Sequence, residues 1–370
     1  MNEKLSLGFG AMRLPITDEE NPESINIKEF TKMIDYCIDD GFNYFDTSYA
    51  YRDDVSEEIL KKALINRYHR ESYKIAGKMP LWLIESEKDN AEITNLMLKH
   101  FNIEYFDVFL LHNINKKFYK QAEAYKTFQY LEKMKEEGLA RKIGIVFHDD
   151  VDLLEEILEK YGDILDYIQI HLNFLDWDKI GNQSRKCYEL CVKYNKEIIA
   201  MGPTKGSTII NNNKDFKIHF DYMKTSASQI ALRFVGSLSN VSIILSDMDN
   251  FEQLKENCDV FKDFKKLSNG ENYFLMTMAK EINKNISVPC IYCNFCLYMC
   301  PLELPIPDFF NLYNAENSYS LKSHYELYDY FSNLHSPASA CSECGICMES
   351  CTEQLDIPFL LKEVVKTFEK

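Results

Sequence analysis

The sequence predicts a (β/α)8 barrel followed by a small, mainly helical domain that is rich in cysteine. Between residue 5 and about residue 262, eight short apolar runs alternate with amphipathic stretches. The runs are rich in Ile, Val, Phe and Tyr, as buried parallel strands are. Eight strand–helix units in about 260 residues match such a barrel in number and size. Of the twelve cysteines, eight lie between Cys290 and Cys351, which indicates a second domain of different composition.

The expected strands are spaced so that a helix can lie between each pair. In chain order they are residues 5–10, 42–47, 73–78, 105–112, 142–148, 167–173, 197–202 and 241–246. Residues 53–69, 227–238 and 250–261 have a helical pattern, and Asp54 or Ser56 could cap the first of these helices. A doubly wound open sheet is the alternative fold, but no G-x-G-x-x-G pattern follows the first strand.

The chain divides into two expected domains. Residues 1–285 are assigned to the barrel, with residues 261–285 as a helical bridge, and residues 286–370 to the second domain. The second domain is too short to hold much apolar core without its thiol clusters. Because no low-complexity linker separates the two parts, we expect them to pack together.

The charge balance argues against two classes of partner. The chain has 58 acidic and 42 basic residues and a formal net charge of -16. Such a surface repels nucleic acid and anionic membranes. No run is apolar enough to span a bilayer, and the first ten residues do not read as a signal peptide. The expected location is therefore the cytoplasm, where densely spaced cysteines favour metal or cluster ligation over disulfides.

Four polar residues fall at the carboxyl ends of successive expected strands, which is where barrel enzymes place catalytic groups. Asp46 and Tyr51 follow the second strand, Lys78 ends the third and His112 ends the fourth. Singly, each residue could be structural, since a lone Lys or His at a strand end often is and Asp46 could merely cap a helix. Their combination on one rim points to chemistry.

The combination suits carbonyl reduction. A hydride that reaches a carbonyl carbon leaves an alkoxide, which needs a proton. Tyr51 is a weak acid, with an ordinary pKa of about 10, and a nearby Lys78 ammonium would lower that pKa. Asp46 would hold the lysine charged and oriented, while His112 could donate to the carbonyl oxygen and polarise it.

Residues 5–262 resemble the aldo/keto reductase family. The motifs that carry the resemblance are "LGFGAMRLP", "FDTSYAYRDDVSEEILKKAL", "IAGK", "FDVFLLH", "IGIVFH", "IQIHLNFLDW", "MGPTKG" and "VSIILSDMDNFEQLKEN". They occur in the family's order, and the family's catalytic tetrad corresponds to Asp46, Tyr51, Lys78 and His112. The resemblance implies a barrel that binds an extended nicotinamide dinucleotide across its rim.

The resemblance also implies which residues touch that dinucleotide. Gln169 matches the residue that bonds the carboxamide, and residues 201–206 match the loop beside the pyrophosphate. The stretch after the eighth strand matches the part that grips the adenosine. The implied cofactor-binding residues are therefore Gln169, Met201, Gly202, Pro203, Ser246, Met248, Gln253 and Asn257.

Two departures from the family pattern bear on the cofactor. Many members have a Ser-Asn pair after the fifth strand, whereas this chain has Val146-Phe147-His148. Many also have basic residues after the eighth strand that pair with the 2′-phosphate of NADP, but here the stretch contains Asp247 and Asp249. A phosphate beside two carboxylates is unfavourable, so we expect NAD(H) to be preferred over NADP(H).

The eight C-terminal cysteines form two runs with the spacing C-x2-C-x2-C-x3-C, which is the bacterial ferredoxin spacing for [4Fe–4S] clusters. Zinc could use C-x-x-C pairs, but it would not require the third thiol and the distant fourth twice over. Three thiols of a run can wrap one cluster while the fourth reaches the other. One cluster is thus assigned to Cys290, Cys293, Cys296 and Cys351, and the other to Cys341, Cys344, Cys347 and Cys300.

The segment resembles a two-cluster ferredoxin domain with a longer insert (residues 301–340) between its motifs. The whole chain is similar to the bacterial aldo/keto reductases that carry a ferredoxin-type iron–sulfur domain. Three functions remain open. The protein could be an oxidoreductase that acts on a small carbonyl or alcohol while its clusters exchange electrons with a redox protein partner. The clusters could instead be structural or sense oxidants. Finally, the barrel could have lost nucleotide binding, leaving an electron-transfer protein.

Overall fold

The computed structural model describes residues 5–18, 24–48, 55–178, 183–205, 220, 225–284, 286–291, 293, 295–318 and 322–369. Its eight parallel strands close into a barrel in which each strand pairs with the next along the chain and β8 pairs with β1. The strands are β1 (Ser6–Gly10), β2 (Tyr44–Asp46), β3 (Lys74–Pro80), β4 (Phe106–Ile114), β5 (Ala140–Phe147), β6 (Tyr167–His171), β7 (Glu197–Met201) and β8 (Val241–Asp247). All eight strands expected from the sequence are confirmed in order, and no strand end differs by more than about two residues.

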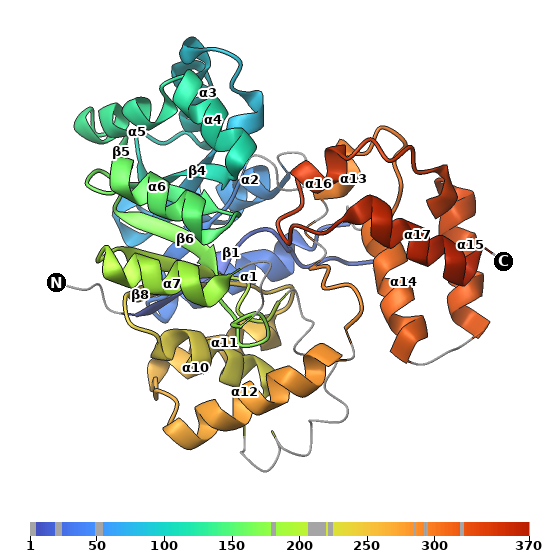
Figure 1. Ribbon diagram of the computed structural model, residues 1–370. Coiled ribbons are helices and arrows are strands. Elements are labelled where there is room, and N and C mark those ends of the chain that lie inside the picture. The colour runs from blue at the N-terminus through green and yellow to red at the C-terminus, as the bar shows by residue number, and fades with distance from the viewer. Residues whose placement is uncertain are drawn as a thin grey trace.

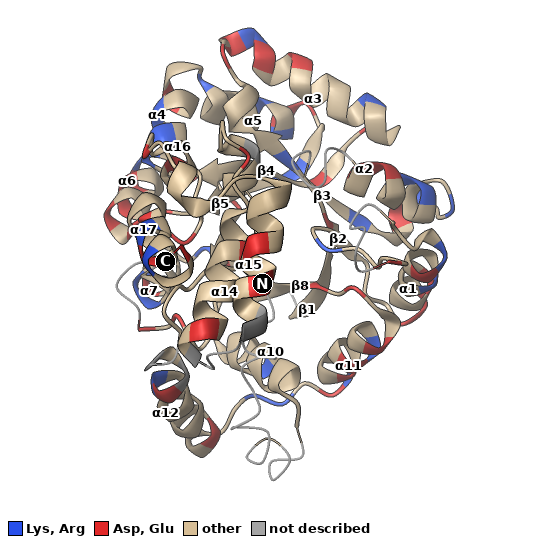
Figure 2. Cartoon of the chain, turned by 90° about the vertical axis from the view of Figure 1, so that its right-hand side faces the viewer, with Lys and Arg blue, Asp and Glu red and all other residues tan. Residues whose placement is uncertain are grey.

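Helices surround the barrel (Figure 1). They are α1 (Ile27–Asp39), α2 (Val55–Leu60), α3 (Glu87–Phe101), α4 (Lys116–Ala124), α5 (Thr127–Glu136), α6 (Val151–Tyr161), α7 (Ser184–Lys193), α10 (Ala227–Ser237), α11 (Phe251–Lys262) and α12 (Asn269–Lys284). Acidic and basic residues are mixed along outer helices such as α2, α3 and α11 (Figure 2). This mixture is typical of solvated helix faces.

One expected helix cap is wrong, and another falls outside the described residues. Ser56 lies inside α2 rather than before it, and its hydroxyl donates to the backbone oxygen of Ala11 at 2.8 Å. A hydroxyl that reaches the residue after β1 ties the helix to the barrel instead of capping its first turn. Asp54, the other candidate, is not among the described residues.

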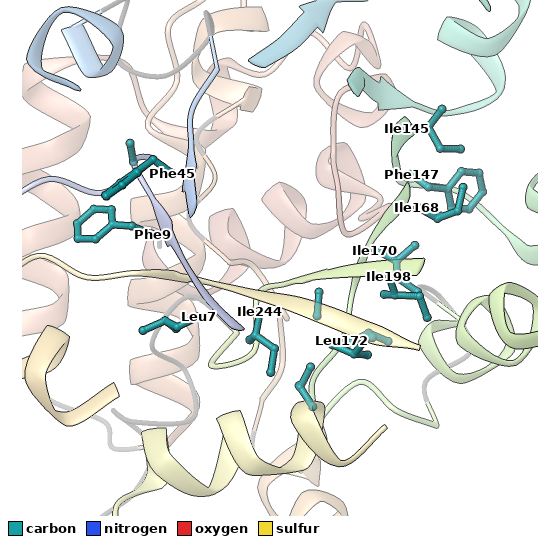
Figure 3. Packing of buried hydrophobic residues seen from close by; sticks show 14 of the residues in the cluster. Leu7, Phe9, Phe45, Ile145, Phe147, Ile168, Ile170, Leu172, Ile198 and Ile244 are labelled. Carbon is teal, nitrogen blue, oxygen red and sulfur yellow. The ribbon is translucent and has the colours of Figure 1, made fainter. Parts of the chain in front are cut away.

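The barrel has two apolar layers. Inside the barrel, buried side chains from alternate strand positions pack together, among them Tyr44, Val108, Val146 and Ile243. The other face of each strand packs against the helices, as Figure 3 shows for the side chains of β1, β2, β5, β6, β7 and β8. The interior is thus filled, and the polar residues gather at the mouth formed by the carboxyl ends of the strands.

The C-terminal part lies on one side of the barrel and has its own apolar core (Figure 1). Its helices are α13 (Phe295–Met299), α14 (Ile306–Ser318), α15 (Lys322–Leu334), α16 (Ile346–Glu349) and α17 (Ile357–Phe368). Within its described residues this part contains helices and one 3-10 turn and no strand. We call residues 286–369 the thiol-rich domain.

Candidate active site at the barrel mouth

Three members of the expected tetrad meet at the mouth. Asp46, Lys78 and His112 end or nearly end β2, β3 and β4, and each is almost fully buried. The Lys78 ammonium donates to Asp46 Oδ1 and, at 3.1 Å, to the backbone oxygen of Thr47. Tyr51, the fourth member, lies outside the described residues.

The charges of this group are set by burial. Burial raises the pKa of Asp46, while the adjacent Lys78 lowers it. The pKa of His112 lies well below its ordinary value, first because the ring is buried and then because Lys78 carries a positive charge nearby. His112 is therefore a neutral imidazole near pH 7, able to donate one hydrogen bond and accept another.

Two neighbours of His112 were not anticipated from the sequence. The hydroxyl of Ser48 lies 3.0 Å from His112 Nδ1. The ring of Trp82, just after β3, lies 5.3 Å from the imidazole between centroids. Both residues belong to loops at the strand ends, so their place next to the tetrad could have been suspected from position but not from any motif.

The thiol-rich domain reaches the same histidine. The ring of Phe295, at the start of α13, lies 6.0 Å from the His112 ring and meets it edge to face. Phe295 immediately precedes Cys296, a cysteine of the first run. The edge-to-face geometry is one that aromatic rings favour. The two domains therefore meet at the candidate active site.

A buried ion network fastens the thiol-rich domain to the mouth. Lys205, in the loop after β7, donates to both carboxylate oxygens of Asp176, at 2.6 and 2.5 Å. It also donates to Glu353 of the thiol-rich domain at 3.1 Å. All three side chains are nearly inaccessible to solvent. The sequence shows Lys205 within "MGPTKG", but nothing in it indicates that Glu353 would be its partner.

Further contacts join the domains at the ends of neighbouring strands. Gln354 donates to the backbone oxygen of His148 at 3.3 Å. Lys117 forms an ion pair with Glu349 at 2.5 Å, and Asn115 donates to the Glu349 backbone at 3.3 Å. The contacts from Phe295 to Gln354 thus fall on the ends of β4, β5 and β7 and the loops after them.

Two more histidines lie where Gln354 contacts the barrel. His148, after β5, and His171, at the end of β6, have ring centroids 5.2 Å apart. The pKa of each is lowered, chiefly by burial. The His171 ring lies against Gly202, whose φ is +62° and where an added Cβ would fall 2.8 Å from His171 Nδ1. Glycine is thus required at this position of the β7 loop on both grounds.

The structure places most of the expected nucleotide-binding residues within the fold. Gln169 is buried, and its amide donates to Met201 Sδ at 3.5 Å. Asn257 donates to Ser246 Oγ at 3.1 Å and accepts from Ser228. The remaining members of the set lie in the loops after β7 and β8. Gly202 and Pro203 follow β7, Met248 is buried after β8, and Gln253 accepts from the Asp249 backbone at 3.2 Å at the start of α11.

The two acids after β8 take different positions. Asp247 lies beside Gly10, where an added Cβ would fall 2.2 Å from Asp247 Oδ1, and it interacts electrostatically with Asp46 and Lys78. The carboxylate of Asp249 instead accepts from the Asn250 amide at 2.9 Å. Asp247 therefore lies at the mouth with Arg13, Asp46 and Lys78 as charged neighbours, and Asp249 belongs to the start of α11.

The cysteine thiols gather in two sets that cross between the runs. The pKa of Cys296 is raised, first by burial and then by the charges of Cys293, Cys290 and Cys351, with Cys347 last. The pKa of Cys347 is raised to about 11, first by burial and then by Cys341, Cys300 and Cys344. Cys296 thus has Cys351, and Cys347 has Cys300, as a charged neighbour from the other run. Within the part of the chain that the structure describes, no group of three or more His, Cys, Asp or Glu side chains is arranged to hold a metal ion.

A pocket opens at the second thiol set. Cys300, Cys341, Cys344 and Cys347 line it together with apolar side chains such as Leu304 and Leu361.

The first set has hydrogen bonds to its sulfurs. Thr352 Oγ1 donates to Cys293 Sγ at 3.5 Å, and the Leu355 backbone donates to Cys351 Sγ at 3.4 Å. No helix among the described residues is both long and apolar enough to cross a membrane.

Comparison with known proteins identifies the barrel. A model of the aldo/keto reductase family matches residues 6–272. Aldo-keto reductase family 1 member C21 of Mus musculus is 26% identical over 290 residues, which cover 69% of this chain and 83% of the relative. The 3-alpha-hydroxysteroid dehydrogenase of Rattus norvegicus is 23% identical over 306 residues, which cover 72% and 91%. The family match ends before Cys290.

Solved structures share the barrel fold. The thermostable aldo-keto reductase Tm1743, in complex with the inhibitor epalrestat, is 24% identical with a TM-score of 0.60, covering 74% of this chain and 94% of that chain. The holo form of AKR11C1 from Bacillus halodurans is 19% identical with a TM-score of 0.56, covering 77% and 93%. At these identities the likeness concerns the fold.

Proposed function

Since this chain belongs to the aldo/keto reductase family, we propose that it transfers a hydride between NAD(H) and a small carbonyl or alcohol and that its thiol-rich domain binds two [4Fe–4S] clusters. One observation carries the proposal. Phe295, next to Cys296, packs against His112 at the barrel mouth. A domain built around thiols therefore adjoins the residues of a carbonyl-reducing site, in one molecule.

The tetrad would act on the carbonyl as follows. His112 is neutral, and the tautomer whose Nε2 carries the ring proton can donate from Nε2 to the carbonyl oxygen while Nδ1 accepts from Ser48. Tyr51 would supply the proton that the nascent alkoxide needs, and Lys78 would lower the tyrosine pKa. Asp46 keeps the Lys78 ammonium charged and oriented inside the barrel.

The thiols suit a positively charged metal centre. Cys290, Cys293, Cys296 and Cys351 would hold one cluster, and Cys300, Cys341, Cys344 and Cys347 the other. Burial and mutual repulsion raise thiol pKa values in both sets, so thiolates there need a nearby cation. When bound, such clusters supply one-electron transfer. A hydride carries two electrons, whereas a cluster transfers one. Because of this mismatch, we propose that the clusters exchange electrons with a redox protein partner.

The preference for NAD(H) rests on charge. Asp247 ends β8 and Asp249 follows it, at a place where a 2′-phosphate would require a cation. The pKa of Asp247 is raised, first by burial, while Arg13 lowers it, Asp46 raises it and Lys78 lowers it.

A second function is favoured by a specific observation. The Glu353 carboxylate accepts a hydrogen bond from the Lys205 ammonium. Thr352 and Gln354 line a pocket together with residues at the ends of β5 and β6. A dinucleotide phosphate that needed Lys205 would compete with this buried carboxylate. The alternative is therefore an electron-transfer protein whose barrel no longer binds nicotinamide.

Anaerobic purification followed by iron and sulfide analysis tests the cluster proposal. Two clusters require on the order of eight irons per chain. A Cys187→Ala variant, which lacks a buried barrel thiol outside both sets, should keep the full iron content, whereas Cys293→Ala should lose about half or more. Stoichiometric zinc in place of iron and sulfide would contradict the proposal.

Titration of the same protein with NADH separates the two functions. Saturable NADH binding with carbonyl-dependent oxidation supports the reductase. Intact clusters without binding of NADH or NADPH would support the electron-transfer protein instead.

A further inference from the structure

A pocket lies between the two domains, beside the tetrad. We call it the interface pocket. His148 and His171 line it from the ends of β5 and β6, Ser184 and Cys187 from α7, and Thr352 and Gln354 from the thiol-rich domain. It thus combines polar groups from three parts of the chain that are distant in sequence.

Ser184 is the residue that points to a ligand. It is 2% exposed, it lines the pocket, and its Oγ has no hydrogen-bond partner among the described residues. A buried hydroxyl without a partner costs about 1–3 kcal/mol. A bound ligand that accepts its hydrogen bond would remove that cost.

Ser184 is also the first residue of α7, whose N-terminus is suited to an anion. The preceding residue, Gln183, provides no side-chain cap, and the first turn contains no acid. It contains Lys186 and Arg185, of which Arg185 forms an ion pair with Asp178 at 2.8 Å. The first-turn amides of a helix are unsatisfied donors at the positive end of its dipole, and they bind oxyanions readily.

One acidic side chain lines the pocket, and its charge is already engaged. Asp149 Oδ2 accepts from the Lys116 backbone at 2.8 Å, and Oδ1 accepts from the Asp150 backbone at 2.8 Å. The Lys116 ammonium lies 3.7 Å from Oδ1. Asp149 is thus held by neighbouring donors and has a cation beside it.

The histidines add groups that can donate to an anion. His148 Nδ1 is buried and has no partner within the described part of the chain. His171 lies next to it. A ring nitrogen can carry the proton toward whichever group requires it.

We propose that the interface pocket binds a small oxyanion, a carboxylate or phosphate group, held by the Ser184 hydroxyl and the first-turn amides of α7. The site requires neither the nicotinamide nor the clusters. Its ligand would contact both domains at once, because Thr352 and Gln354 close one side of the pocket.

Calorimetric titration of the full anaerobic protein with sodium phosphate and, separately, sodium acetate tests the site. We expect one saturable site for at least one of the two anions. Ser184→Ala should weaken that binding about tenfold or more, as expected for losing a hydrogen bond to a charged group. Ser237→Ala is the matched control, because its hydroxyl already donates to the Arg233 backbone, and it should bind as the unmodified protein does.

Gln354→Glu gives a second measurement. Gln354 is exposed, so its substitution does not disturb the buried interior as a change at Ser184 could. This exposed residue lines the pocket, so a carboxylate there should repel either anion and weaken binding severalfold. Preference for phosphate or for acetate identifies the ligand's charged group. Absence of saturable binding for both anions would overturn the proposal. So would an affinity in Ser184→Ala and Gln354→Glu that equals the affinity of the unmodified protein.

Discussion

The Lys78 ammonium and the Asp46 carboxylate are buried together at the end of the barrel. Desolvating two charges costs several kcal/mol each, and their attraction often only offsets that cost. Burial indeed raises the pKa of Asp46 even though Lys78 lies beside it. Such a pair is weak evidence for stability, so we infer that it is retained for the chemistry at the mouth.

The tetrad is tested at Tyr51. Tyr51→Phe removes only the proton donor, so we expect kcat for carbonyl reduction to fall at least about 100-fold while NADH binding stays nearly unchanged. Anaerobic NADH oxidation and a fluorescence titration measure the two quantities. Tyr273→Phe, at an exposed position on α12, is the control. Unchanged turnover in Tyr51→Phe would show that the barrel uses a different acid.

Among the elements, the strands were predictable because each is a short apolar run between amphipathic stretches. The tetrad positions Asp46, Lys78 and His112 could be predicted for the same reason, since they end such runs. Trp82, Phe295 and Glu353 could not be predicted, because their roles depend on which loops meet in space. No periodicity in the sequence encodes a contact between Lys205 and a residue of the second domain.

We propose that the turn between β8 and α11 sets the nucleotide preference. Asp249→Lys replaces a carboxylate by a cation without touching Asp247, which has Asp46 and Lys78 among its charged neighbours. We expect the variant to shift binding toward NADPH over NADH by about 1–3 kcal/mol, the scale of a hydrogen bond gained between charged groups. Parallel titrations with both nucleotides measure the shift. Tighter NADPH binding by the unmodified protein would refute the charge argument.

The start of α12 is tied to α10 by an ion pair that gives a pH dependence. Arg233 donates to Glu271 at 2.8 Å, and this bond, opposed by burial and aided by Ser268, lowers the Glu271 pKa from 4.5 to about 2. A lowered pKa stabilises the fold above the unfolded-state value and loses that effect as pH falls toward about 2. Because both side chains are partly exposed, we expect about 1–2 kcal/mol.

Chemical denaturation of Glu271→Gln between pH 7 and pH 3 measures this contribution. The variant should be less stable than the unmodified protein at pH 7, and the difference should shrink below about pH 4.5. Glu92→Gln, on the exposed face of α3, should show little change. A difference that stays constant over the whole pH range would assign the effect to packing instead.

In the whole molecule, the two domains are joined by charges that solvent hardly reaches. Lys205 lies between Asp176 and Glu353, and the sum of the three charges is negative. Around this network, Phe295 and Gln354 add an aromatic contact and a hydrogen bond. The thiol-rich domain is therefore part of the barrel mouth and not an appendage on a flexible tether.

The network should respond strongly to loss of its cation. Lys205→Met leaves two carboxylates buried without the ammonium that they share, which costs about 3–5 kcal/mol. Hydrogen exchange should show lost protection at residues 351–354 and in the loop after β7. Lys193→Met removes an exposed pair with Glu155 and should cost about 0–1 kcal/mol. Equal protection in both variants would show that the network does not hold the domains together.

The long separation of Glu353 from Lys205 along the sequence also has a consequence for synthesis. Glu353 follows Lys205 by 148 residues, which at about 5–20 residues per second means a delay on the order of ten seconds. All eight strands leave the ribosome before the carboxylate that covers Lys205 does. A newly made barrel therefore has an open mouth until the thiol-rich domain, which is translated after it, can cover it.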